Sequence, residues 1–263
     1  MTGFSISWLD LRESADFKAR DKFLALQALQ WLERSNGGAD KILLDLGSGT
    51  GSTLRAFASL GAHHLVWRLV DYNSSLLDEA LKRHSKDYVI EDYQADLNVI
   101  NELPLVGVRL VTASALFDLV SCEFIDALIE RLATQTTALY VALNYDGVTE
   151  WSPAHPLDAA VLDAFNRDQQ RDKGFGPALG PHASAYLISS LQKAGYAVAT
   201  AASPWQLSAT DHALVSQLVY GIAEAVAKHF DQFELNNWKD FRLAHAASGI
   251  CKVGHQDLLA LPL

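Results

Sequence analysis

The stretch from Ile42 to Gly51 places the tightest constraint on how this chain can fold. Ile42 to Leu44 is an apolar run typical of a strand buried on both faces, and a helical pattern begins directly after Gly51. Gly47 and Gly49, with Gly51, let the backbone turn sharply and let a ligand approach it closely, because they have no Cβ. This order of strand, glycine turn and helix indicates the ligand-binding corner of a doubly wound α/β sheet.

Polar residues follow the next three predicted strands, at 64–70, 88–95 and 108–112. Asp71 ends the first of them, where a carboxylate can accept both hydroxyls of a ribose. Asp96 ends the second, where a ligand-binding role and an ordinary role as a turn residue or helix cap are about equally favoured.

The segment Ser114 to Asp118 follows the third of these strands, at the sheet edge where α/β proteins bind ligands. Asp118 precedes a predicted helix over 122–134, so capping that helix is its simpler interpretation.

The spacing Asp-x-Gly-x-Gly-x-Gly, which begins at Asp45, resembles motif I of class I S-adenosylmethionine (SAM)-dependent methyltransferases. Asp71, Asp96 and 114–118 follow in the order that this family shows. The resemblance implies a doubly wound, mostly parallel, seven-stranded Rossmann-like α/β sheet with an antiparallel last strand. It also implies that SAM lies across the glycine turn and that Asp96 accepts from the adenine amino group. The cofactor-binding residues expected on this basis are Asp45, Gly47, Ser48, Gly49, Gly51, Asp71, Tyr72, Asp96, Leu97, Ser114 and Arg20.

An N-terminal helical segment, residues 1–37, precedes the first strand. Its helical pattern covers 5–35 and ends near Asn36-Gly37-Gly38, and such a helix is expected to cover the cofactor cleft. The charged residues around 10–20 favour a solvated helix face. The alternative is that Arg12 or Arg20 meets the methionine carboxylate of SAM.

A cap insertion is expected over 145–182, after a strand at 137–143. It combines a helical pattern over 156–170, a glycine-proline string over 174–182 and four aromatics, which argue against disorder. The expected role is a cover that selects a small, apolar or aromatic substrate. The aromatics are Tyr145, Trp151, Phe165 and Phe175.

The remaining pattern completes a single domain over 1–263. Helices are predicted over 183–193, 211–229 and 236–247, and strands over 196–203 and 252–261. The last of these is expected to be the closing antiparallel strand.

Methyl transfer needs a general base only if the nucleophile arrives protonated. The candidates are His155, His182, Asp118 and Tyr145, each of which also has an ordinary packing or capping role, so no catalytic residue is assigned. No metal is expected, because no His, Cys and Asp cluster has zinc spacing.

A formal net charge of −10 argues against nucleic acid as a partner, since phosphate binding needs clustered Lys and Arg. The segment 114–118 also lacks the Asn-Pro-Pro-Tyr-like motif of methyltransferases that act on nucleic-acid amino groups. Cys122 and Cys251 form no motif, no stretch resembles a signal peptide, and no apolar run is long enough to span a membrane. A cytoplasmic protein is therefore expected.

Three functions remain open at this point. A SAM-dependent methyltransferase that transfers a methyl group to O, N or C of a small molecule is favoured. A nicotinamide-dependent oxidoreductase is disfavoured, because Gly-x-Gly-x-Gly is not the dinucleotide spacing Gly-x-Gly-x-x-Gly. A non-catalytic SAM-binding module is the third.

Overall fold

The computed structural model describes residues 4–34 and 41–263. Its sheet has the strand order β3-β2-β1-β4-β5-β8-β6, and the short strand β7 pairs with β8 beside this path. β1 to β5 are parallel, whereas β8 is antiparallel to both β5 and β6. The expected seven-stranded, mostly parallel sheet with an antiparallel last strand is confirmed. The strands are β1 (Ile42–Leu46), β2 (Val66–Asp71), β3 (Val89–Gln94), β4 (Val108–Ser114), β5 (Ala138–Ser152), β6 (Tyr196–Ala202), β7 (Trp205–Leu207) and β8 (Ile250–Pro262).

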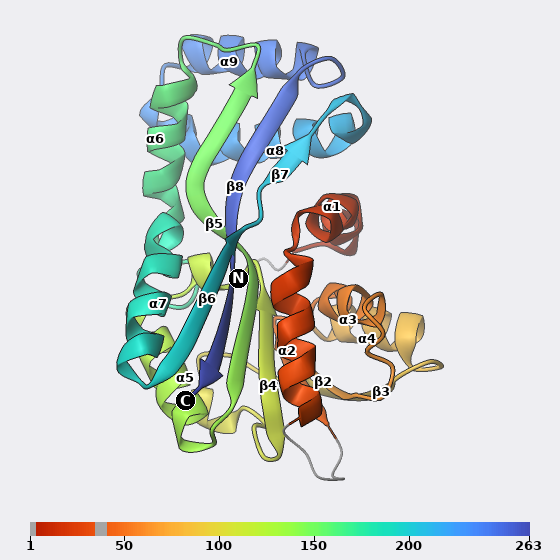
Figure 1. The fold of residues 1–263 in the computed structure, drawn as a ribbon. Coiled ribbons are helices and arrows are strands. Elements are labelled where there is room, and N and C mark those ends of the chain that lie inside the picture. The colour runs from red at the N-terminus through yellow and green to blue at the C-terminus, as the bar shows by residue number, and fades with distance from the viewer. Residues whose placement is uncertain (1–3, 35–40) are drawn as a thin grey trace.

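Helices cover both faces of the sheet (Figure 1). Leucines and aromatics of α2, α3 and α4 share one buried cluster with β1 and β2, and those of α5 and α7 share another on the opposite face. Within the described residues, none of the helices is long and apolar enough to cross a membrane. The helices are α1 (Ile6–Ala19), α2 (Lys22–Arg34), α3 (Ser52–Ala58), α4 (Ser74–His84), α5 (Cys122–Thr134), α6 (Asp158–Gln169), α7 (Ala183–Lys193), α8 (His212–Val226) and α9 (Gln232–Ala244).

The strand order reverses at β1, which has β2 and β3 on one side and β4 and β5 on the other. Ligands of open α/β sheets bind outside the carboxyl ends of the strands at such a switch point. The glycine turn leaves β1 at this end, and the segment beginning at Ser114 leaves β4 beside it. The topology therefore brings the two predicted ligand-binding segments together.

Two strands extend well beyond the main sheet. β5 and β8 continue together to a distal layer that also contains β7, α6, α8 and α9 (Figure 1). A third buried cluster fills this distal layer and includes Val219, Trp238 and Val253. The sequence predicts a separate cap insertion over 145–182. In the structure, residues 145–152 instead continue β5 and belong to the sheet. Much of the helical layer there comes instead from α8 and α9.

The N-terminal segment also differs from the continuous helix expected over 5–35. It forms two helices that break at Arg20 and Asp21. Asp21 starts the second helix, since its Oδ1 accepts from Leu24 N at 2.8 Å, and its own N–H donates to Asp257 Oδ2 at 2.8 Å. The expected end near Asn36-Gly37-Gly38 lies outside the described residues.

Candidate functional site

The glycine turn is held against the end of β2 by backbone and carboxylate contacts. Gly47, Gly49 and Gly51 have φ of +61°, +53° and +83°, a region that favours glycine. The N–H of Ser48 donates to Val70 O at 3.0 Å, and that of Gly49 donates to the Asp71 carboxylate at 2.9 Å. The turn is therefore fixed before any ligand binds.

A cavity of about 770 Å³ lies at this edge of the sheet. Its wall includes the turn, the ends of β2, β3 and β4, part of α1, and the loop 172–175. Eight of the predicted cofactor residues line it: Gly47, Ser48, Gly49, Asp71, Tyr72, Asp96, Leu97 and Ser114. The cofactor role of each remains a prediction.

Three predicted residues lie outside the lining. Asp45 is buried beneath the turn, where its Oδ1 accepts from Thr112 Oγ1 at 2.6 Å, and burial raises its pKa to about 6. Arg20 is also buried, and its Nη2 donates to Ser114 Oγ at 2.8 Å. Gly51 faces His84, whose ring would lie 3.1 Å from an added Cβ. All three support the cavity wall from behind.

Asp71 is placed between the turn and the cavity. Its Oδ2 accepts from Gly49 N, and its Oδ1 accepts from Asn73 N at 2.9 Å. Burial raises the pKa of Asp71, and these backbone donors partly oppose the rise by favouring the charged form. The carboxylate is thus held rigidly where it faces the cavity.

An ion pair on α1 forms another part of the wall. Arg12 Nε and Nη2 donate to Asp16 at 2.8 and 3.1 Å, and the guanidinium lies 5.0 Å from the ring centre of Trp205. Trp205 Nε1 in turn donates to Asp16 Oδ1 at 2.9 Å. Of the two arginines proposed for the methionine carboxylate, Arg12 lines the cavity.

The sequence interpretation missed Asp16, although its spacing from Arg12 is that of an i, i+4 ion pair. The charge pattern predicts a solvated helix face, whereas the side chains of Arg12 and Asp16 are both buried. Trp205 had no local signal, since its contact with Asp16 joins distant parts of the chain. Lining residues outside the predicted set include Phe4, Leu9, Asn73, Leu119 and Lys173, whereas Leu116 lies within the predicted segment 114–118.

The four acid–base candidates lie outside the lining of this cavity. His155 lies just before α6, where its Nδ1 accepts from Leu157 N at 3.2 Å, and the exposed His182 ends a short 3-10 helix before α7. Tyr145 donates to Asn166 Oδ1 at 2.9 Å, and burial raises its pKa to about 12. Asp118 is buried, and Leu116 and Leu119, which are close to it in sequence, line the cavity. Burial raises the pKa of the Asp118 carboxyl to about 6.

The aromatics expected to form a substrate cover are divided between two places. Tyr145, Trp151 and Phe165 belong to or pack on the distal cluster, away from the cavity lining. Phe175 does line the cavity, and it packs edge-on against Phe124 of α5 with ring centres 5.3 Å apart. The reason is that strand β5 carries the first part of the expected cap into the distal layer.

Replacing His255 with asparagine is expected to make folding less sensitive to acid. Burial, with the nearby charge of Arg12, lowers the pKa of His255 to about 4. The His255 side chain is therefore protonated below about pH 6.5 in the unfolded chain but only below about pH 4 in the folded chain. Because the unfolded chain binds the extra proton between these values, the free energy of unfolding decreases as the pH falls.

The measurement is urea unfolding of both proteins between about pH 7 and pH 4.5. The stability of the wild type relative to the variant should fall by about 2–3 kcal/mol over that range. Parallel pH profiles would show that His255 does not remain neutral in the folded state.

No protein-family model matches the sequence, and comparison with curated proteins also gives no match. Solved structures similar to this chain include a SAM-dependent methyltransferase from Geobacter sulfurreducens in complex with S-adenosyl-L-homocysteine (16% identity, all of both chains, TM-score 0.49). Another is a cyclopropane synthase from Mycobacterium tuberculosis (12% identity, 89% of this chain and 83% of that one, TM-score 0.47). A third is a sarcosine dimethylglycine methyltransferase, so described provisionally, from Galdieria sulphuraria (10% identity, 97% of each chain, TM-score 0.46).

Proposed function

We propose that this protein is a SAM-dependent methyltransferase that acts on a small molecule. The observation that carries the proposal is the glycine turn at the switch point of the sheet. The turn is held by a hydrogen bond from Gly49 N to the Asp71 carboxylate, and it borders a cavity of about 770 Å³. That volume lies within the usual range for small-molecule and cofactor sites.

The residues present fit the cofactor. An added Cβ at Gly49 would lie 3.1 Å from Leu9 of α1, so the close approach of this helix to the turn leaves little room for a side chain there. Ser48 Oγ is buried and has no hydrogen-bond partner among the described residues, which suits a polar ligand group at the turn. In this proposal Asp71 holds the ribose, Asp96 and Leu97 hold the adenine, and Arg12 faces the methionine carboxylate.

Bound SAM supplies an electrophilic methyl group, so the chain's own residues act mainly by position. Leu116, Leu119 and Phe175 line the cavity, and in this proposal they shield the bound methyl group from water. A mostly apolar wall of this kind suits a small apolar or aromatic acceptor, and the net charge of −10 disfavours nucleic acid. A cytoplasmic location is part of the same proposal.

The proposal is tested by thermal unfolding with SAM, S-adenosylhomocysteine or NAD added separately. A ligand at about 100 times its dissociation constant adds about 2.7 kcal/mol of stability. For a chain of this size that corresponds to a rise in Tm of about 5–10 °C. SAM and S-adenosylhomocysteine should produce this rise and NAD should not. Stabilisation by NAD alone would favour the oxidoreductase.

A non-catalytic SAM-binding module is the second candidate, because the four acid–base candidates all lie outside the cavity lining. The two functions differ in turnover. A methyltransferase incubated with isotopically labelled SAM and a panel of phenols, amines and carboxylic acids should release S-adenosylhomocysteine with at least one of them. Tight binding of SAM without release for any acceptor would favour the module.

A further inference from the structure

The helix α1 lines one side of the cavity and has few fully buried residues. Among its fourteen residues only Arg12, Ala15 and Asp16 are buried. By contrast, α2 buries three leucines and two alanines in the core of the sheet. Ala15 belongs to the distal cluster, but Trp8, Leu11 and Ala19 are only partly buried against it, so polar contacts add to the packing that positions α1.

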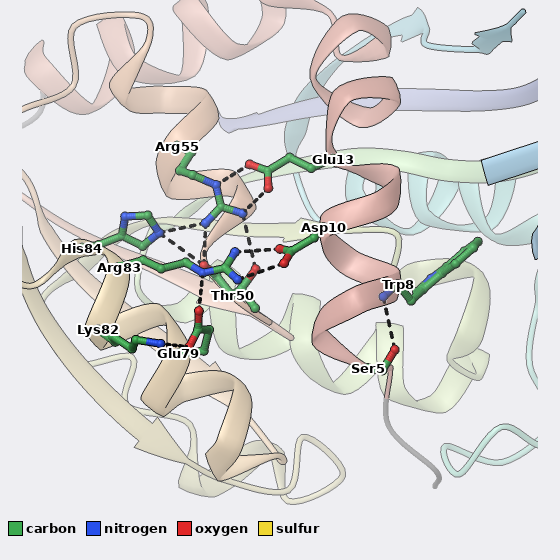
Figure 2. Close-up of polar contacts among 10 residues, drawn as sticks. All are labelled: Ser5, Trp8, Asp10, Glu13, Thr50, Arg55, Glu79, Lys82, Arg83 and His84. Atoms are coloured by element: carbon green, nitrogen blue, oxygen red, sulfur yellow. Dashed lines mark hydrogen bonds and ion pairs between the residues drawn. The ribbon is translucent and has the colours of Figure 1, made fainter. Parts of the chain in front are cut away.

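One set of polar contacts joins the outer side of α1 to α4. Asp10 accepts from Arg83 Nη1 at 2.7 Å and from Nη2 at 3.1 Å, a two-point contact shown in Figure 2. Arg83 also donates to Glu79 on its own helix at 2.8 Å. The guanidinium is therefore already oriented by α4 when it meets α1.

A second set joins α1 to the glycine turn itself. Glu13 accepts from Arg55 of α3 through both Nη2, at 2.7 Å, and Nε. The remaining nitrogen of Arg55, Nη1, donates to Thr50 O at 2.6 Å and lies 2.8 Å from His84 Nε2 (Figure 2). Thr50 belongs to the turn and lines the cavity. One guanidinium thus connects the helix over the cavity with the backbone under it.

We propose that the pairs Asp10–Arg83 and Glu13–Arg55 form an ionic latch that holds α1 closed over a ligand in the cavity. The inference rests on the proposed function, since it concerns exchange of the same cofactor. Asp10 and Glu13 are positioning residues: they touch α3 and α4, and they act on the ligand through the position of Leu9 and Arg12. Both carboxylates are partly exposed, so each pair contributes little alone and is screened by salt.

The test uses the full chain and the double variant Asp10→Asn with Glu13→Gln. S-adenosylhomocysteine should dissociate from the double variant roughly fivefold faster than from the wild type at low salt. Raising NaCl from about 0.05 M to about 0.5 M should accelerate release from the wild type but change the double variant little. The matched control is Glu150→Gln, which breaks the exposed pair with Lys252 on β5 and β8 and should behave as the wild type.

Hydrogen exchange of α1 amides in the ligand-free proteins provides a second readout. Exchange should be faster in the double variant than in the wild type and the control. If the wild type does not bind S-adenosylhomocysteine, the proposed function is wrong. The ionic latch is then tested by comparing the hydrogen exchange of α1 in the three proteins. Equal exchange in all three proteins, or equal release rates and salt dependence, would overturn the latch.

Discussion

The variant Asp71→Ala is expected to bind S-adenosylhomocysteine about 1–3 kcal/mol more weakly than the wild type, a loss of roughly 5- to 150-fold. Two contributions are removed together. The proposed acceptor of the ribose hydroxyls is lost, and Gly49 N loses the carboxylate that fixes the glycine turn. The measurement is isothermal titration calorimetry on both proteins.

Two variants serve as comparisons for this result. Asp92→Ala removes an exposed carboxylate on the neighbouring strand β3, outside the cavity lining, and should bind as the wild type does. Asp96→Ala should lose less than Asp71→Ala, since one adenine contact is at stake. Normal binding by a folded Asp71→Ala variant would show that the ribose assignment is wrong.

The variant Trp205→Ala is expected to lose about 3–5 kcal/mol of stability towards unfolding, because the ring is buried in the distal cluster. The guanidinium of Arg12 lies over the same ring, and the ring Nε1 donates a hydrogen bond to Asp16. Ligand affinity should therefore fall as well, although Trp205 itself does not line the cavity. Urea unfolding and calorimetry on the same samples measure the two effects.

Trp205→Phe separates packing from hydrogen bonding. It keeps most of the buried ring but removes the N–H that Asp16 accepts, so stability should fall less than in the alanine variant while affinity still falls. Tyr220→Ala, which truncates a half-exposed aromatic on α8, is the control and should change stability by less than about 0.5 kcal/mol. If Trp205→Phe binds the ligand with wild-type affinity, Trp205 contributes to packing only and its hydrogen bond to Asp16 does not affect binding.

The parallel part of the fold was predictable because its signals are local. The apolar run at Ile42, the glycines after it and the helical pattern beyond Ser52 all lie within a short window. The same holds for Asp71 and Asp96, since the carboxyl ends of parallel strands all lie at one edge of the sheet. The predicted bounds of α5 and α7 match those observed.

The path of β5 was not predictable in the same way. Asn144, Asp146 and Gly147 look like the end of a strand, and the prediction stopped at Leu143. The strand instead continues through two irregularities, with Leu143 at φ +59° and its N–H donating to Asp257 Oδ1 at 2.8 Å. Asp257 lies on β8, so the feature that sustains β5 is a partner more than a hundred residues away.

The same long-range dependence explains why Tyr145 and His155 lie outside the lining of the cavity. Tyr145 and His155 follow the strand-five pattern in sequence, which suggested the ligand edge of the sheet. Continuation of β5 carries them into the distal layer instead. The residue types of Tyr145 and His155 indicate possible acid–base chemistry. Their position in the fold depends on the pairing of β5 with β8, which no local sequence pattern encodes.

The central place of β8 has a consequence for biosynthesis. β8 lies between β5 and β6, so neither strand can pair on the side that faces β8 until residues 250–262 are available to the folding chain. A chain still emerging from the ribosome can pair β1 to β5 but must expose an open edge on β5, which invites pairing with other nascent chains. Completion of the sheet therefore waits for β8, and slow synthesis of the residues between β5 and β8 prolongs the period in which that edge needs protection.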